Sequence, residues 1–145
     1  PDDYVESITE RLSLYTRLDN CETEAELLAL HDEMIDRFGP VPAQVEDLFD
    51  TVRIRKLAVS LGFEKLILKQ EDLRCYFIDR PDSPYFESDA FRQILAYIQK
   101  HTNKAKLKQA GKHFLLVVDD VRSMSDLLAF LRRMGNFVLA EGVPA

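Results

Sequence analysis

The hydrophobic period of this sequence changes at Gly62, and that change restricts the folds that the chain can adopt. Up to Gly62, apolar residues recur every three or four positions, which is the spacing of amphipathic helices. Beyond it, residues 63–68 and 73–78 are rich in β-branched and aromatic residues and are separated by a polar loop, as in a β-hairpin. We therefore expect one domain, 1–145, with a helical part (1–62) and a sheet-containing part (63–145).

Three helices are predicted before the change of period. The first covers residues 3–18, and its apolar stripe consists of Tyr4, Ile8, Leu12 and Tyr15. The second begins at Thr23, whose hydroxyl can cap the helix while Glu26 completes a capping box, and it ends at Gly39. The third begins near Pro42, because proline loses no hydrogen bond in a first helical turn.

The second half of the chain is expected to alternate between strands and helices. A helix starts at Ser88 and ends near residue 101, and strands follow at 104–108 and 114–118. A last helix is capped by Ser123 or Ser125 and is expected to stop at Gly135. The predicted class is α+β: three helices, then ββ-α-ββ-α with a small, mainly antiparallel sheet.

The charge of the chain is unevenly distributed. There are 19 basic and 25 acidic residues, a net charge of −6. Residues 1–50 hold 3 basic and 14 acidic residues, net −11, whereas the remainder holds 16 and 11, net +5. An acidic balance argues against nucleic acid as the main ligand, and an asymmetry of this size bears on partners and docking.

Targeting and redox signals are sparse. The two cysteines, Cys21 and Cys75, show no metal-ligand or disulfide-framework spacing, and no apolar run approaches a membrane span. No secretory signal opens the chain, so we expect a cytoplasmic protein without membrane contact. Because the sequence starts at Pro1 rather than Met, we expect it to be a piece of a longer protein.

The sequence contains no common catalytic motif. Phosphate-binding, dinucleotide-binding, nucleophile-elbow and zinc-protease patterns are absent, and the three histidines lack ligand spacing, so no catalytic, metal or cofactor residues are predicted. An alternative is a small enzyme with a diffuse acidic site at Asp119 and Asp120, which end a strand. A deep pocket lined by both and by a histidine would favour that alternative.

A basic stripe offers a second alternative. Lys104, Lys106 and Lys108 alternate with apolar residues on a predicted strand. Such lysines usually protect an exposed strand edge, and this interpretation is favoured. Alternatively, Lys104–Lys112 forms a weak nucleic-acid contact, whose binding would fall steeply with salt.

An acidic cluster on the second helix is more informative. Asp32 and Asp36 lie one turn apart and repel each other, while Glu33 can pair with Arg37 four residues on. The cluster is either a solvated helix face or a ridge that docks onto arginines of another domain, where charge pairs would set the register.

Several segments resemble a known family. They are Pro1-Asp2-Asp3-Tyr4-Val5, Arg11-Leu12-Ser13-Leu14-Tyr15, Ile35-Asp36-Arg37-Phe38-Gly39 followed by Pro42, and Leu61-Gly62. In combination they resemble the C-terminal (TRCF) domain of the bacterial transcription-repair coupling factors, the Mfd family. The resemblance is close over about the first 65 residues and loose after Phe63.

The resemblance implies a module without its own active site or cofactor. In that family the domain follows an ATP-dependent DNA-translocating motor, where ATP and Mg²⁺ bind, and folds back onto an N-terminal UvrB-like domain. It thereby hides the surface that recruits UvrA until the factor engages a stalled RNA polymerase. Acidic residues of the I-D-R-F-G helix contact arginines of the N-terminal domain. Here these are Glu33 and Asp36, with Asp32 as a helper, and little or no direct nucleic-acid binding is implied.

Overall fold

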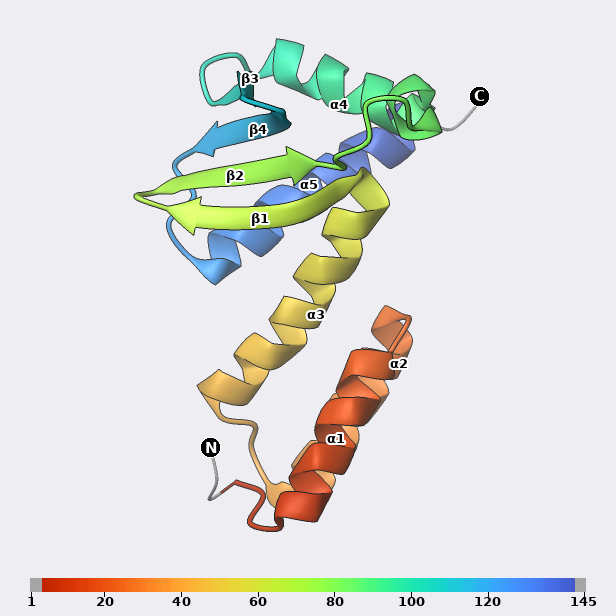
Figure 1. Cartoon of the computed structure of the whole chain (residues 1–145). Coiled ribbons are helices and arrows are strands. Elements are labelled where there is room, and N and C mark those ends of the chain that lie inside the picture. The colour runs from red at the N-terminus through yellow and green to blue at the C-terminus, as the bar shows by residue number, and fades with distance from the viewer. Residues whose placement is uncertain (1–3, 143–145) are drawn as a thin grey trace. The chain divides into compact units, whose positions relative to one another are not determined.

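The chain divides into two compact units, residues 1–53 and 54–145, and the division falls inside the long helix α3 (Ala43–Leu61). The computed structural model describes residues 4–142, and the side chains of 4–137 (Figure 1). Among the described residues, no helix is both long and apolar enough to cross a membrane. The organisation of 1–145 as one domain stays a prediction.

The first unit is built from α1 (Ile8–Asn20), α2 (Glu24–Phe38) and the first part of α3. The predicted N-cap of α2 is confirmed, since the Thr23 hydroxyl accepts a hydrogen bond from the backbone N–H of Glu26 at 3.1 Å. The Glu26 carboxylate accepts from the N–H of Glu22 at 3.0 Å, one residue before the cap. Gly39 ends the helix with a positive φ of 88°, as expected. The buried side chains of this unit include Leu14, Leu18, Leu27, Leu30, Met34, Val45, Phe49 and Val52.

The apolar stripe predicted on the first helix is not the side that is buried. Ile8 and Leu12 are 65% and 61% exposed, and the helix begins only at Ile8, after the Ser7 cap. Leu14 and Leu18 are buried instead. The helix carries more apolar residues than one face can bury, so packing against α2 and α3, not spacing alone, selects the buried face. Tyr4 precedes the helix, and its hydroxyl donates to the Gly39 carbonyl at 2.9 Å.

The second unit contains a four-stranded antiparallel sheet. Its strands are β1 (Phe63–Lys69), β2 (Asp72–Phe77), β3 (Ala105–Ala110) and β4 (His113–Asp119), in the spatial order β1-β2-β4-β3. A short 3₁₀ helix, η1 (Pro84–Glu87), precedes α4 (Asp89–Lys100), and α5 (Met124–Gly142) follows the sheet. The predicted α+β class and its order of helices and strands are therefore confirmed.

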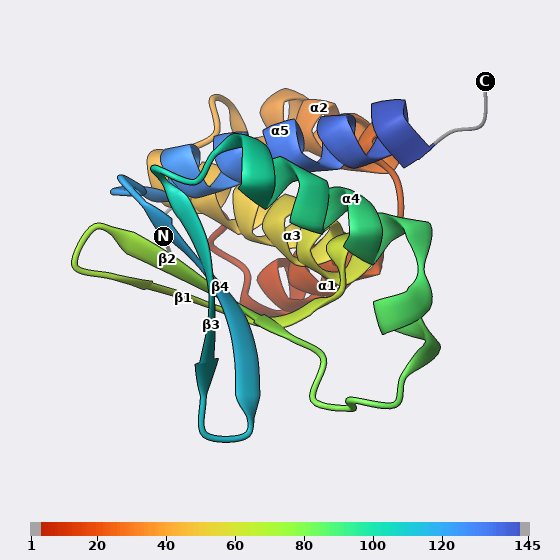
Figure 2. The ribbon, with the colours of Figure 1, turned by 90° about the horizontal axis from the view of Figure 1, so that it is seen from above.

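Helices α4 and α5 pack on the same side of this sheet (Figure 2). The pairing register aligns Leu66, Cys75, Leu116 and Leu107 across the four strands. Cys75 and Leu116 are fully buried in the core that includes Ile94 of α4 and Leu131 of α5. The rows on either side of this one point to the opposite face, because side chains alternate along a strand.

Gly62 lies at the end of a helix, whereas Gly135 lies inside one. Gly62 joins α3 to β1 with φ +91°, and a Cβ there would lie 2.1 Å from the Tyr85 ring. Gly135 was expected to end the last helix, but α5 runs on to Gly142. A single glycine weakens a helix without ending it when the flanking residues are packed, as Leu131 and Met134 are here.

Candidate functional site

The acidic cluster predicted as a docking site lies on a firmly held helix. We refer to Asp32, Glu33 and Asp36 as the acidic ridge. The opposite face of α2 is buried through Leu27, Leu30 and Met34. Arg53 of α3 also holds the helix start, donating to both carboxylate oxygens of Glu24 at 2.9 to 3.2 Å. The ridge is therefore presented by a fixed backbone.

Glu33 faces α1 and is already paired. Its two carboxylate oxygens accept hydrogen bonds from the Arg17 guanidinium at 2.6 and 3.0 Å. Arg37 approaches Glu33 at 3.4 Å, the predicted i,i+4 pair, and also pairs with Glu10 of α1. The hydrogen bonds from Arg17 hold the pKa of the Glu33 carboxyl below its usual value. The sequence pattern had indicated Arg37 and could not indicate Arg17, which is 16 residues away.

Asp32 and Asp36 face solvent. Both are exposed, and within the part of the chain that the structure describes neither carboxylate has a hydrogen-bond or ion-pair partner. They lie beside two exposed apolar side chains of the same helix, Leu28 (51%) and Ile35 (41%). We call these four residues the outer face of α2. Chemically, it can accept guanidinium or ammonium donors and cover a small apolar area, and it holds no nucleophile.

The alternative acidic site, at Asp119 and Asp120, is part of a pocket. Asp119 and Asp120 line a cavity of about 160 Å³ together with His101, Lys104, Asp126 and Arg133. His101 Nδ1 donates to the Tyr97 carbonyl at 2.8 Å, and its ring stacks on Tyr97 with centroids 4.1 Å apart. Asp120 lies 3.5 Å from Arg122. This is the lining that the enzyme alternative calls for, but among the described residues neither aspartate is hydrogen-bonded to the histidine.

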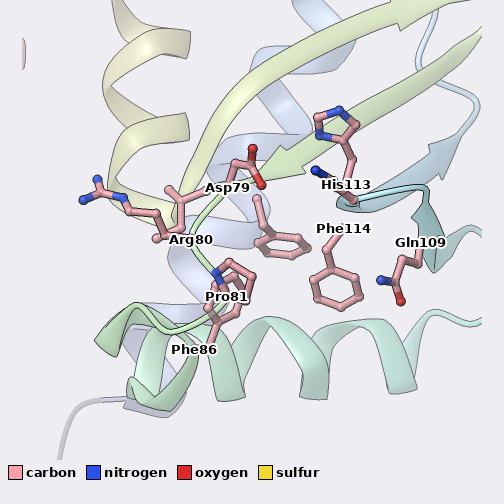
Figure 3. A pocket seen from close by; sticks show the side chains of 10 residues that line it. Asp79, Arg80, Pro81, Phe86, Gln109, His113 and Phe114 are labelled. Carbon is pink, nitrogen blue, oxygen red and sulfur yellow. The ribbon is translucent and has the colours of Figure 1, made fainter.

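A second pocket was not predicted from the sequence. It measures about 230 Å³ and lies where β2 ends beside the β3–β4 turn (Figure 3). Phe77, Phe86 and Phe114 form its apolar wall, and Phe77 stacks on Phe114 with centroids 5.2 Å apart. Asp79 and His113 lie at the polar side. These aromatic residues come from three separate segments, so no local motif could reveal them.

The remaining candidate residues are the lysines of β3 and the two cysteines. Lys106 and Lys108 lie exposed on β3 and line neither pocket, whereas Lys104 lines the first pocket and Lys112 the second. Within residues 4–137 no group of three or more histidine, cysteine or acidic side chains could hold a metal ion. The two cysteines are buried, and no disulfide links them. The outer face of α2 is therefore kept as the candidate site.

The chain thus joins a three-helix segment to an antiparallel α+β unit and carries an exposed acidic face on α2. A family model described as the TRCF domain matches residues 1–88. The chain belongs to the TRCF domain family. The predicted resemblance is thus confirmed, and the matched region extends beyond the first 65 residues.

Curated relatives and a solved structure agree with this assignment. The chain is 34% identical over 112 residues to the transcription-repair-coupling factor of Rickettsia conorii, which covers 77% of this chain and 9% of the relative. It is 42% identical over 66 residues to that of Escherichia coli K12, 46% of this chain and 6% of the relative. The crystal structure of the C-terminal domain of a transcription-repair coupling factor superposes with a TM-score of 0.74 at 20% identity, over 97% of this chain and 85% of that one. The fold is therefore shared across both parts of the chain. The chain spans less than a tenth of the length of the two curated relatives, from R. conorii and E. coli.

Proposed function

We propose that this chain is a non-catalytic regulatory domain of a transcription-repair coupling factor, and that it docks through the outer face of α2 onto the N-terminal UvrB-like domain of the same polypeptide. Docking masks the surface that recruits UvrA and keeps the factor repressed. The observation that carries the proposal is the pair of exposed, unpartnered carboxylates of Asp32 and Asp36 beside Leu28 and Ile35. Family membership supports this choice of partner.

A small, polar surface suits a lock that must open. A domain tethered in the same chain meets its partner at millimolar effective concentration, so a few contacts hold it closed. Interfaces between domains of one chain are smaller and more polar than obligate ones. Arginines on the partner could bind the two carboxylates in a fixed register and cover the apolar pair, and loss of a few contacts would release the domain.

The three ridge residues have separable roles in this proposal. Asp36, with Asp32 beside it, supplies charge that is not used within the unit. Glu33 keeps 38% of its side chain exposed while bound to Arg17, so it contributes at the edge of the interface and holds α1 against α2. The interface is therefore expected to depend more on Asp36 than on Glu33.

Family membership supports a proposal about the parent polypeptide. We propose that the parent polypeptide is an ATP-dependent DNA translocase of the cytoplasm that acts on stalled RNA polymerase. ATP and Mg²⁺ then bind in motor domains outside this chain, and UvrA and RNA polymerase are indirect partners. This domain itself carries out no reaction.

UvrA binding by the full-length factor tests the proposal. Asp36→Arg places a cation opposite the expected arginines, so UvrA affinity should rise at least tenfold, with a smaller rise for Asp36→Asn. Asp47→Arg is the matched control, because Asp47 is also an exposed acidic residue of the first unit but lies on α3. Its UvrA affinity should equal that of the parent sequence. Unchanged affinity in both Asp36→Arg and Asp32→Arg would refute the docking surface.

A further inference from the structure

The register of the sheet gathers basic residues from three strands on the face opposite α4 and α5. One row across the strands reads Ile67, Arg74, Val117 and Lys106. The row two residues along reads Lys65, Tyr76, Leu115 and Lys108. These rows alternate with the buried rows that face the helices, so their side chains share the open face. We call Lys65, Arg74, Lys106 and Lys108 the cationic face.

All four basic residues are exposed, and among the described residues none of them forms an ion pair. Lys65 holds its ammonium over the Tyr76 ring, 5.4 Å from the centroid. Both rows lack acidic residues. The next row on this face reads Lys69, Asp72 and Asp119, so the uncompensated positive charge is confined to the two rows of the cationic face.

Little apolar area is available on this face. Leu115 and Val117 are 3% and 9% exposed, although they are outside the core under the helices. Their neighbours in register are long side chains, Tyr76 and Lys108 beside Leu115, and Arg74 and Lys106 beside Val117. The stems of such residues cover apolar neighbours while the charged ends stay in water. A partner would thus meet charge rather than an apolar groove.

The spacing of the charges suits a polyanion. Strands are about 4.8 Å apart, so Arg74 and Lys106 are separated by about 10 Å and Lys65 and Lys108 by about 14 Å across the sheet. The two rows lie about 7 Å apart along the strands. Duplex DNA carries one negative charge per about 1.7 Å of its axis, so several phosphates fall within an area of this size.

We propose that the cationic face binds the sugar–phosphate backbone of nucleic acid without reading its sequence. The unit of residues 54–145 holds 15 basic and 11 acidic residues, whereas residues 1–53 hold 4 and 14, so the local charge is favourable although the whole chain is acidic. Tyr76 is covered by Lys65, which favours contact with phosphates over stacking on bases. Lys106 and Lys108 on β3 alone would indicate protection of a strand edge. Lys65 and Arg74 come from the β1–β2 hairpin, and their presence on the same face favours a binding surface instead. The proposal uses no residue of the outer face of α2.

Salt-dependent binding to nucleic acid tests this inference in the 145-residue chain, without the motor domains. A labelled 30-base-pair duplex is titrated between 50 and 200 mM salt and followed by fluorescence anisotropy. Four phosphate contacts give a slope of log K against log salt of about −3.6, which is a loss of affinity of about a hundredfold over this range. Lys106→Gln combined with Lys108→Gln should reduce the slope by about half, and Arg74→Gln alone by about 1.

Lys100→Gln is the matched control, because Lys100 is an exposed lysine of the same unit that lies on α4. It should leave affinity and slope unchanged. The inference is overturned if no binding is seen at 50 mM salt and millimolar chain, if Arg74→Gln leaves the slope unchanged, or if poly-glutamate binds as tightly as the duplex. Because UvrA is absent from the assay, failure here leaves the docking proposal standing.

Discussion

The Arg17 guanidinium on α1 donates hydrogen bonds to both carboxylate oxygens of Glu33 on α2, at 2.6 and 3.0 Å. This pair of hydrogen bonds connects two helices of the first unit. It involves Glu33, the middle residue of the acidic ridge. Asp32 and Asp36, one position before and three after it, stay exposed. A carboxylate that is paired within the fold and two exposed carboxylates without such a pairing are thus neighbours on one helix, and experiments can separate their effects.

The Arg17–Glu33 pair should be visible in an acid titration. Because the native pKa of Glu33 is lowered, its contribution to stability is present above the unfolded pKa and is lost as the pH falls through the native value. We expect the pKa of Glu33, followed by NMR, to lie below the usual glutamate range. In the Arg17→Gln variant the pKa of Glu33 should rise back into that range. Arg37→Gln is the control and should shift it less, since Arg37 is 3.4 Å from Glu33. Equal shifts in both variants would contradict the dominance of Arg17.

Gly62→Ala should destabilise the second unit strongly. The new methyl group would meet the Tyr85 ring, whose hydroxyl donates to the Leu61 carbonyl, and the positive φ would add backbone strain. Together these effects should cost about 2–4 kcal/mol in urea unfolding. Gly111→Ala is the matched control, with φ +62° and nothing within 4 Å of the added Cβ. It should cost about 1 kcal/mol, the strain alone, and equal costs would show that Tyr85 yields freely.

Gly135→Ala should have the opposite sign. Gly135 lies inside α5, and an added Cβ would reach only Leu57 Cδ2, at an ordinary contact distance of 3.8 Å. Replacing a helix-interior glycine by alanine gains about 0.5–1 kcal/mol, so the urea midpoint should rise. A fall in the midpoint would mean that the helix ends at residue 135.

Local chemistry made some elements predictable. Thr23 and Ser88 cap α2 and α4 as expected, because a hydroxyl before an apolar-periodic run satisfies free N–H groups whatever the rest of the fold does. The hairpin of β1 and β2 followed from two β-rich runs with a polar loop between them. The acidic ridge was located for the same reason, since i,i+4 geometry depends only on the helix.

Contacts between distant segments were not predictable from the pattern. The choice of Leu14 and Leu18 over Ile8 and Leu12 as the buried side of α1 was decided by α2 and α3. The aromatic pocket around Phe77 and Phe114 likewise depends on how separate segments meet.

The sequence by itself determined the α+β class, the helix caps, the family and the position of the acidic ridge, because each of these depends on residues close together in the chain or on a recognisable combination of motifs. Only the tertiary structure decided which ridge carboxylate is already paired and which basic residues share a face. Arg17 reaches Glu33 across 16 positions, and Arg74 aligns with Lys106 through the register of β4. Such pairings are set by packing and strand order, for which one-dimensional spacing holds no information.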